Sequence, residues 1–382
     1  MNPISIPPMP FYWRVHGVPK TDNIIADKWP FEFDYEEELG LITQKYTPNL
    51  KGYLNQIYKA ESNIGYLQDA NLLAKPYGSD LFRFINQNTI TPGKASQILE
   101  IGCGGCTVLE NLKQTGHKVT GLDPSPVALK AGKKKNIQVI HDFFPSQQLH
   151  DKFDLIFHSD VLEHVPDPVS FLRDHKSHLK KSGQVLISVP DCTESISLGD
   201  LSMTLHQHLN YFDEESLYAV LAAAGFEVIV IEKALYGGSL YALGRNTDKT
   251  SMSTPKPQQE KFVLFNNRAQ QAIKQFTNYI STLESTNNSL GFYVPLRSFP
   301  YLAFLNKEIH YRIFDDTDHW HHKFFDGYDR PIENRNDLMK KPVKNLIIMS
   351  LTFGDIIEKK IRSEMGSQTN IIQLREILDF SV

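Results

Sequence analysis

The stretch ILEIGCGGC, from Ile98 to Cys106, decides the fold that this sequence predicts. Its apolar start predicts a short buried strand, and the glycines that follow predict a tight turn into a helix. Such a turn lets a ligand approach the backbone closely, and the N-terminus of a helix attracts anionic groups. Gly102 and Gly104 match two positions of the dinucleotide-binding pattern G-x-G-x-x-G, but Thr107 occupies the third. From these residues alone, a tight turn without any ligand stays an open alternative.

The residues around this turn predict an α/β domain with a mostly parallel sheet. From about residue 97 to 245, short apolar runs with β-branched residues alternate with helical spacers. The region ends in FEVIVIEKALYGGSLYALGR, where two strands are separated by a few residues around Gly237 and Gly238. We therefore expect an antiparallel hairpin at the edge of the sheet.

Changes in composition divide the chain into four segments. Residues 1–85 begin with a proline- and aromatic-rich stretch and continue with helical periodicity, which predicts a mainly helical N-terminal lid or substrate-binding segment. Residues 86–246 form the predicted α/β core, and residues 247–285 combine a polar linker with an amphipathic helix. Residues 286–382 repeat the alternation of strands and helices, so we expect a second, small Rossmann-like α/β domain there.

The composition narrows the class of protein. The chain has 382 residues, of which 41% are hydrophobic and 22% charged, as in an ordinary globular protein. Its net charge of −4 argues against a general nucleic-acid-binding protein, which usually has a basic face. Three cysteines cannot build a disulfide framework or a four-cysteine zinc site. Because there is no apolar run of membrane-spanning length and no signal-peptide pattern, we expect a cytoplasmic protein that does not interact with membranes.

Acidic and aromatic residues follow several predicted strands. Asp123 ends the strand VTGLD, and Asp142 with Phe143 follows the next strand in IHDFF. The first carboxylate could accept hydrogen bonds from both ribose hydroxyls, and the second could flank an adenine together with the aromatic ring. Open α/β sheets bind ligands at the carboxyl ends of their strands. These residues therefore predict a nucleoside site beside the glycine-rich turn.

The segments EIGCG, GLD, DFF and FDLIFHSDVLEHV resemble the class I S-adenosylmethionine (SAM)-dependent methyltransferases. The expected antiparallel hairpin is a further feature of that family, and Cys106 stands where many members have a third glycine. The resemblance implies SAM as the cofactor and assigns parts of it to individual residues. The methionine part would be surrounded by Glu100, Gly102, Cys103 and Gly104, with His158 nearby; the ribose would be held by Asp123, and the adenine bordered by Asp142 and Phe143.

The stretch HLNYFDEESLYAVLAAAGFEV and the later GGSL resemble one subgroup, the C-methyltransferases of nucleotide-linked keto-deoxysugars. The resemblance implies that a histidine removes a proton beside a ketone, and that the enolate attacks the methyl group of SAM. A base with a pKa near the working pH is efficient for this step. The matching residue is His208, and Tyr58 of the N-terminal segment would enclose the site or stabilise the enolate. The chain lacks the subgroup's N-terminal zinc module and has Leu205 and Gln207 beside the base position, where the subgroup has tyrosine and glutamate.

Two alternatives to sugar C-methylation stay open. One is O-methylation of a hydroxyl group on a sugar or other small molecule, and the other is a SAM-binding interaction module without catalysis. His206 and His208 could also form a metal pair if they pointed the same way on a strand. A metal site needs a third and usually a fourth ligand, and no pattern near the pair supplies one. We therefore expect no metal site, and a structural role for His206.

Overall fold

The computed structural model describes residues 3–11, 15–19, 28–59, 74–89, 94–247, 259–285, 289–306, 308–365 and 368–378, and all structural statements below concern these ranges. The chain forms two compact units. One comprises Tyr35–Cys192 and Gln207–Gln258, and we call it the central unit. The other comprises Met1–Asp34, Thr193–His206 and Gln259–Val382, and we call it the terminal unit. Within the described ranges, no helix is both long and apolar enough to cross a membrane.

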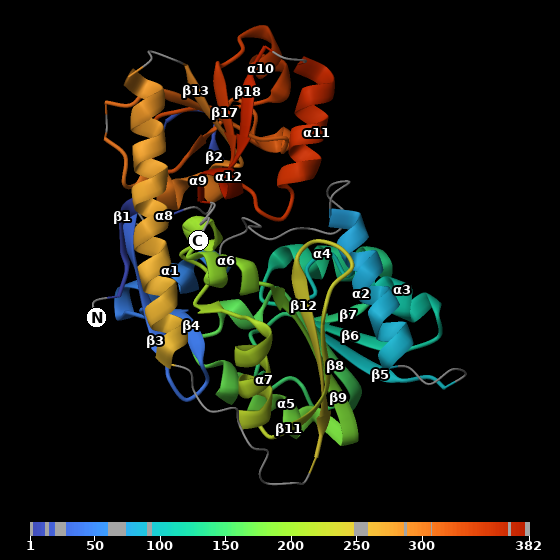
Figure 1. Ribbon diagram of the computed structural model, residues 1–382. Helices are drawn as coiled ribbons and strands as arrows, with labels where there is room; N and C mark the ends of the chain where they lie inside the picture. Colours follow the sequence, from blue (N-terminus) through green and yellow to red (C-terminus); the bar gives the residue numbers. More distant parts are fainter. Residues whose placement is uncertain are drawn as a thin grey trace. The chain divides into compact units, whose positions relative to one another are not determined.

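The central unit contains a seven-stranded sheet, with the order β11-β12-β9-β8-β5-β6-β7 (Figure 1). The five strands from β9 to β7 are parallel, whereas β12 is antiparallel to both β9 and β11. The predicted parallel core with an antiparallel hairpin is thereby confirmed. The strands are β5 (Gln97–Ile101), β6 (Lys118–Leu122), β7 (Gln138–Ile140), β8 (Phe153–Ser159), β9 (Leu179–Pro190), β11 (Phe226–Lys233) and β12 (Ser239–Asn246).

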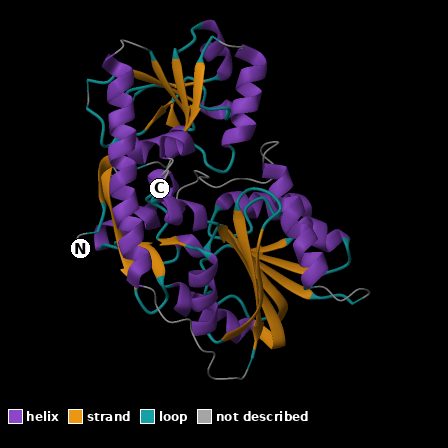
Figure 2. Ribbon diagram, in the orientation of Figure 1, coloured by secondary structure: helices purple, strands orange, loops and turns teal. Residues whose placement is uncertain are grey.

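Helices cover both faces of this sheet (Figure 2). One buried apolar cluster joins the sheet to α2 (Ala74–Asn88), α3 (Thr107–Gln114) and α4 (Pro126–Lys135). A second cluster joins the opposite face to α5 (Pro168–His178) and α7 (Glu214–Ala223). Side chains of alternate residues in a strand point to opposite faces, so the apolar strands have to be covered on both sides.

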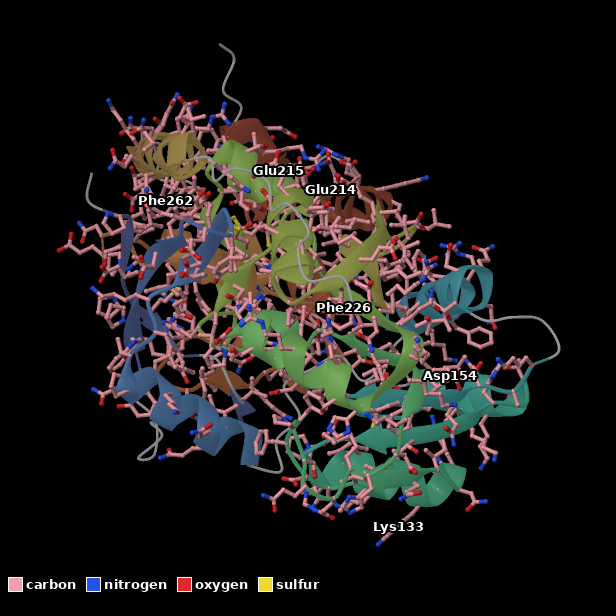
Figure 3. The ribbon with its side chains drawn as sticks, turned by 90° about the horizontal axis from the view of Figure 1, so that it is seen from below. Lys133, Asp154, Glu214, Glu215, Phe226 and Phe262 are labelled. Atoms are coloured by element: carbon pink, nitrogen blue, oxygen red, sulfur yellow. The ribbon has the colours of Figure 1, made fainter. Side chains whose placement is uncertain are left out.

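Local sequence signals fix where these helices begin. The side chain of Asp213 accepts a hydrogen bond from the backbone amide of Ser216, and the Ser216 side chain bonds back to the amide of Asp213. This capping box starts α7, with Glu214 and Glu215 in its first turn (Figure 3).

At the opposite end of the sheet, Asp154 accepts hydrogen bonds from the amide of Gln97 and from the side chain of a lysine.

The N-terminal segment differs from the prediction of a mainly helical lid. Residues up to Gln44 form the strands β1 (Ser5–Pro10), β2 (Val15–His16), β3 (Lys28–Glu36) and β4 (Leu41–Gln44), and the helix α1 (Pro48–Lys59) follows. In the central unit, β4 pairs antiparallel with β10 (Asn210–Tyr211). In the terminal unit, β1 pairs with β3, and β2 pairs with β15 (Phe324–Phe325). The prolines and aromatic residues within β1 and β3 therefore belong to extended chain, for which they are suited by backbone preference and packing.

The terminal unit contains a five-stranded parallel sheet, with the order β16-β14-β13-β17-β18. In chain order this is 3-2-1-4-5, the order of a doubly wound α/β sheet. The strands are β13 (Leu290–Tyr293), β14 (Tyr311–Phe314), β16 (Ile332–Glu333), β17 (Asn345–Ile348) and β18 (Asn370–Gln373). The helices of this unit are α6 (Thr193–Leu198), α8 (Gln259–Ser285), α9 (Pro295–Leu302), α10 (Arg335–Lys340), α11 (Gly354–Met365) and α12 (Leu374–Leu378).

Candidate functional site

The glycine-rich turn lies at the carboxyl end of β5. Gly102 and Gly104 have φ angles of 73° and 43°, which glycine adopts without strain. The amide of Gly102 donates to the carbonyl of Leu122 over 2.7 Å, and the amide of Gly104 donates to Oδ2 of Asp123 over 2.9 Å. A Cβ atom at position 102 would lie 2.6 Å from a methyl group of Val161. The turn thus requires glycine both for its backbone angles and for space.

A buried carboxyl group lies just before this turn. Glu100 is 4% exposed, and its Oε2 has no hydrogen-bond partner among the described residues. Burial, together with the nearby Cys106 and Asp123, raises the pKa of Glu100 well above its usual value. Buried polar atoms in native proteins nearly always have partners. An acceptor without a donor therefore marks this position as a place where a ligand can supply one.

Asp123, Asp142 and Phe143 lie where the sequence predicts a nucleoside site. Asp123 follows β6, is 7% exposed, and uses Oδ1 to accept a bond from the amide of Ser125. Asp142 follows β7, and a hydrogen bond from Ser146 lowers its pKa, so it is ionised at neutral pH. The ring of Phe143 is 42% exposed. Two carboxylates and an exposed aromatic ring fit a ligand with hydroxyl groups and a flat base.

Three further groups meet after β8. Glu163, His164 and His208 each offer one ligand atom, and these atoms lie within 4.8 Å of one another. The rings of His164 and His208 are in edge contact, with centroids 5.0 Å apart. Glu163 is 1% exposed, and neither of its carboxyl oxygens has a hydrogen-bond partner among the described residues. We call these three residues the acid–histidine cluster.

Burial shifts the protonation of the cluster. It raises the pKa of Glu163 well above the usual value, and the neighbouring Asp160 adds to this shift. It also lowers the pKa of His164 to about 4, although a hydrogen bond to the carbonyl of Gln207 opposes the change. Nδ1 of His164 lies 2.7 Å from that carbonyl oxygen and donates to it, so Nε2 carries the lone pair. Near neutral pH the cluster therefore contains a neutral imidazole beside a carboxyl group that is difficult to ionise.

Hydrogen bonds between two segments that are distant in the sequence hold the two halves of the cluster together. The amide of Leu209 donates to the carbonyl of Glu163 over 2.6 Å. Nδ2 of Asn210, a residue that is 3% exposed, donates to the carbonyls of Leu162 and Val165 over 3.1 and 2.7 Å. Asn210 thereby links the segment that carries His208 to the turn that carries Glu163 and His164.

The cluster includes residues that the sequence analysis did not place beside His208. No sequence pattern near His206 and His208 supplied a further ligand, whereas the fold brings Glu163 and His164 to His208. The expected absence of a metal site stays a prediction. The sequence analysis also missed Glu163 and Asn210 as site residues. The only available signal for Glu163 was its place next to His164 in the strand-end stretch DVLEHV.

The remaining predicted residues have different surroundings. His206 belongs to the terminal unit and is not on a strand; its Nε2 donates to the carbonyl of Trp29 over 2.9 Å, and its ring stacks on Phe11 at 4.6 Å. This agrees with a structural role. The side chain of Tyr58, in α1, lies outside the described residues.

His158 is fully buried on β8, with its ring against Phe171 and His175 of α5. Both of its ring nitrogens lack hydrogen-bond partners among the described residues. This packing gives His158 a place in the core between the sheet and α5, and a contact with the cofactor stays a prediction.

Comparison with known proteins places this site in a family. A family model described as "Methyltransferase domain" matches residues 74–231. The chain is 30% identical over 176 residues to the ubiquinone biosynthesis O-methyltransferase of Aeromonas salmonicida, covering 41% of this chain and 74% of that protein. It is 29% identical over 185 residues to the mitochondrial ubiquinone biosynthesis O-methyltransferase of Schizosaccharomyces pombe, covering 42% and 66%.

Other matches are shorter or more distant. The chain is 35% identical over 104 residues to the ubiquinone biosynthesis O-methyltransferase of Actinobacillus pleuropneumoniae, covering 24% of this chain and 44% of that protein. Among solved structures, the N-methyltransferase NodS of Bradyrhizobium japonicum, in complex with S-adenosyl-L-homocysteine (SAH), matches with a TM-score of 0.39 and 17% identity. That match covers 52% of this chain and all of NodS.

Proposed function

Because the chain belongs to the class I SAM-dependent methyltransferases, we propose that it methylates the carbon beside the ketone of a nucleotide-linked keto-deoxysugar, with His208 as the base. The observation that carries the proposal is the acid–histidine cluster, which surrounds His208 with Glu163 and His164. SAM, when bound, supplies an electrophilic methyl group on a positively charged sulfur. The protein has to bind both reactants and remove one proton from the acceptor.

The residues of the glycine-rich turn are proposed to hold SAM. Gly102, Cys103 and Gly104 would follow its methionine part, with Glu100 accepting a hydrogen bond that the protein does not provide. Asp123 would accept bonds from the ribose hydroxyls, and Asp142 with Phe143 would border the adenine. The backbone angles at the turn and the exposed ring of Phe143 support this assignment.

The cluster gives His208 two properties of a catalytic base. Its ring is held against His164, whose own position is fixed by the carbonyl of Gln207. When His208 takes a proton, the imidazolium lies close to the Glu163 carboxyl group, and the carboxylate form of Glu163 would stabilise the new charge. Proton removal and charge stabilisation thus occur within one cluster.

The doubly wound sheet of the terminal unit, taken by itself, supports a nucleotide-binding role for that unit. Sheets with the strand order found there commonly bind nucleotides at the carboxyl ends of their strands. This support comes from the fold alone, and fold does not determine the ligand.

O-methylation of a small-molecule hydroxyl group is the second candidate, and two observations favour it. The similar curated proteins carry the name O-methyltransferase. In addition, the carboxyl and imidazole groups of the cluster are suitable ligands for a divalent cation. A cation there would lower the pKa of a bound hydroxyl group, so deprotonation would not depend on His208 as a free base.

Hydrogen exchange in heavy water tests the proposal. We expect the purified protein to exchange a proton beside the ketone of a nucleotide-linked keto-sugar for deuterium, as followed by proton NMR. The variant His208→Ala should lose this exchange, and His150→Ala, which removes an exposed histidine, should keep it.

Other outcomes decide between the candidates. Methylation of a hydroxyl group that needs no exchange and stops on treatment with EDTA would replace the proposal by cation-assisted O-methylation. SAH binding without product from either class of acceptor would favour an interaction module without catalysis.

A further inference from the structure

Two of the three cysteines of the chain meet inside the glycine-rich turn. The Sγ atoms of Cys103 and Cys106 lie 3.8 Å apart, and the amide of Cys106 donates to the carbonyl of Cys103 over 2.7 Å. That bond closes a four-residue turn, in which the terminal Cα atoms lie within about 7 Å of each other. Disulfides join Cα atoms that are roughly 4.4–6.8 Å apart. The reduced turn is therefore already close to the backbone geometry of a disulfide.

The backbone at Cys106 is unusual for a residue with a side chain. Its φ and ψ angles are 56° and 29°, in the left-handed region. A residue other than glycine is disfavoured there by roughly 1–2 kcal/mol. Strain of this kind, kept at a ligand-binding turn, points to a use for the side chain. The feature that a cysteine adds at this position is its sulfur atom, beside that of Cys103.

We propose that Cys103 and Cys106 form a reversible disulfide that weakens SAM binding. The reaction needs a two-electron oxidant, for which a small peroxide is suitable. The two thiols give up two protons and two electrons, one S–S bond forms, and hydrogen peroxide is reduced to two molecules of water. Dithiols reverse the step by thiol–disulfide exchange. The inference rests on the proposed role of the turn in holding the cofactor.

Formation of the bond has to distort the turn. An S–S bond is about 2.05 Å long, so the two sulfur atoms have to approach each other by roughly 1.7 Å. The residue after Cys103 is held in place, because the backbone amide of Gly104 donates a hydrogen bond to the carboxylate of Asp123. The sulfur of Cys103 also packs directly on β6, where a Cβ atom at Gly121 would lie 2.5 Å from it. Pulling this sulfur towards Cys106 displaces Gly104, and with it the bond to the carboxylate that is proposed to hold the ribose.

The surroundings keep the pair reduced until an oxidant enters. Cys103 is 4% exposed and Cys106 is fully buried. The hydrogen bond with Cys106, burial and the nearby Glu100 raise the pKa of the Cys103 thiol. Because the thiolate is the reactive form, the raised pKa slows every oxidation of this thiol, and the burial of both sulfur atoms admits only a small oxidant. Cys192 is also buried, and it provides a control for the reactivity of a single thiol.

The experiment measures SAH binding by calorimetry before and after treatment with hydrogen peroxide. We expect the dissociation constant to rise at least about tenfold, which is 1.4 kcal/mol. Mass spectrometry of the peptide with residues 103–106 should show the loss of two hydrogen atoms, and dithiothreitol should restore both mass and affinity. Cys192→Ala should respond as the unmodified sequence does, whereas Cys106→Ala should keep its SAH affinity under peroxide.

The outcomes separate this inference from the proposed function. A disulfide that leaves SAH affinity unchanged overturns the inference, and so does a turn that stays reduced under peroxide. If reduced protein binds SAH and the variant Gly102→Ala binds it equally well, the proposed position of the cofactor is wrong instead. Should Cys106→Ala fold poorly, Cys106→Gly replaces it, because glycine is suited to the left-handed angles at this position.

Discussion

The two α/β sheets of this protein carry buried acids that differ in their hydrogen-bond partners. In the terminal unit, Asp316 follows β14 and accepts hydrogen bonds from Tyr293 over 2.6 Å and Arg335 over 2.6 Å, with Lys360 at 3.3 Å. Burial alone would raise the pKa of Asp316, but the bond from Tyr293 and the charge of Arg335 outweigh it and lower the pKa. This acid is ionised and fully engaged by the protein itself.

Two buried acids of the central unit, Glu100 and Glu163, have no such donors. Oε2 of Glu100 and both carboxyl oxygens of Glu163 lack hydrogen-bond partners within the described ranges, and burial raises the pKa of both residues. A buried polar group without a partner lowers stability by about 1–3 kcal/mol. The comparison teaches that position at a strand end is not sufficient to identify a site. The unsatisfied acids are the groups that can still interact with a ligand, whereas Asp316 stabilises its own unit.

Replacement of Glu163 provides the strongest test of this difference. We expect Glu163→Gln to lower the rate of methyl transfer roughly 10²-fold, because the neutral amide cannot provide the negative charge that stabilises protonated His208. Asp316→Asn should leave the rate within about twofold and lower the free energy of unfolding by about 1–2 kcal/mol, because Arg335 loses one of its two charged partners and keeps Glu364. Initial rates at saturating SAM and urea titrations measure the two effects. Equal rates for the two variants would remove the distinction between the sheets.

Two glycines allow the same comparison for cofactor affinity. Gly102→Ala should weaken SAH binding about tenfold or more, since a side chain at its left-handed φ costs roughly 1–2 kcal/mol and meets Val161. Gly291 lies on β13, and an added Cβ would meet Phe314 at 2.7 Å. Gly291→Ala should therefore lower stability by about 1–3 kcal/mol through overpacking and leave SAH affinity unchanged. Calorimetry of both variants checks the pair, and weaker SAH binding by Gly291→Ala would contradict it.

A third test uses the buried histidines of the central unit. Burial lowers the pKa of His175 to about 4, although a bond to the carbonyl of Phe171 opposes the shift. A histidine with a lowered pKa contributes stability that is complete above its unfolded pKa, near 6.5, and is lost as the pH falls towards 4. Lowering the pH from 7 to 5 should therefore cost about 2 kcal/mol from His175 alone.

Two carboxyl groups with raised pKa values change the stability in the opposite direction, and their effect has to be separated from that of His175 in the experiment. Glu100 and Glu163 have raised pKa values, so their contribution to stability is complete at low pH and is lost as the pH rises. The variant His175→Gln keeps a donor for the carbonyl of Phe171 and removes only the histidine titration. Urea titrations at pH 7 and 5 should show that the free energy of unfolding decreases less for His175→Gln than for the unmodified sequence.

The predictable parts of this protein are those that short sequence patterns encode. The strand, turn and helix around Gly102 follow from apolar residues, glycines and a helix start within a few positions of each other. The antiparallel hairpin follows in the same way from two apolar runs around Gly237 and Gly238. The amphipathic helix predicted within residues 247–285 is α8, which spans Gln259–Ser285.

The acid–histidine cluster could not be predicted because it depends on contacts that are distant in sequence. Glu163 meets His208 only because the amide of Leu209 and the side chain of Asn210 bond to the turn at residues 162–165. The burial of His206 depends likewise on the carbonyl of Trp29, far earlier in the chain. The strands of the N-terminal segment were missed because helical periodicity after Thr47 was extended over residues that precede it.

The smallest expected effect concerns a single hydroxyl group in each unit. Tyr293→Phe removes one donor from Asp316, which keeps Arg335 and Lys360, so we expect a loss of about 1 kcal/mol in the free energy of unfolding. Tyr77→Phe removes the donor to the carbonyl of Gly237 in the hairpin of the central unit, and a similar loss is expected.

Stability alone cannot distinguish these two tyrosines, but their effects on pH dependence can. Removing the Tyr293 hydroxyl raises the folded-state pKa of Asp316, since the bond from Tyr293 is the largest influence that lowers it. A carboxyl group with a lowered pKa contributes stability above its unfolded pKa, which is lost as the pH falls. Tyr293→Phe should therefore lose less stability than the unmodified sequence when the pH is lowered from 5 to 3. Tyr77 donates to a carbonyl that does not titrate, so Tyr77→Phe should lose as much as the unmodified sequence. Equal acid sensitivity of both variants would show that Asp316 is not held in its ionised form by its neighbours, and that the two sheets treat their acids alike.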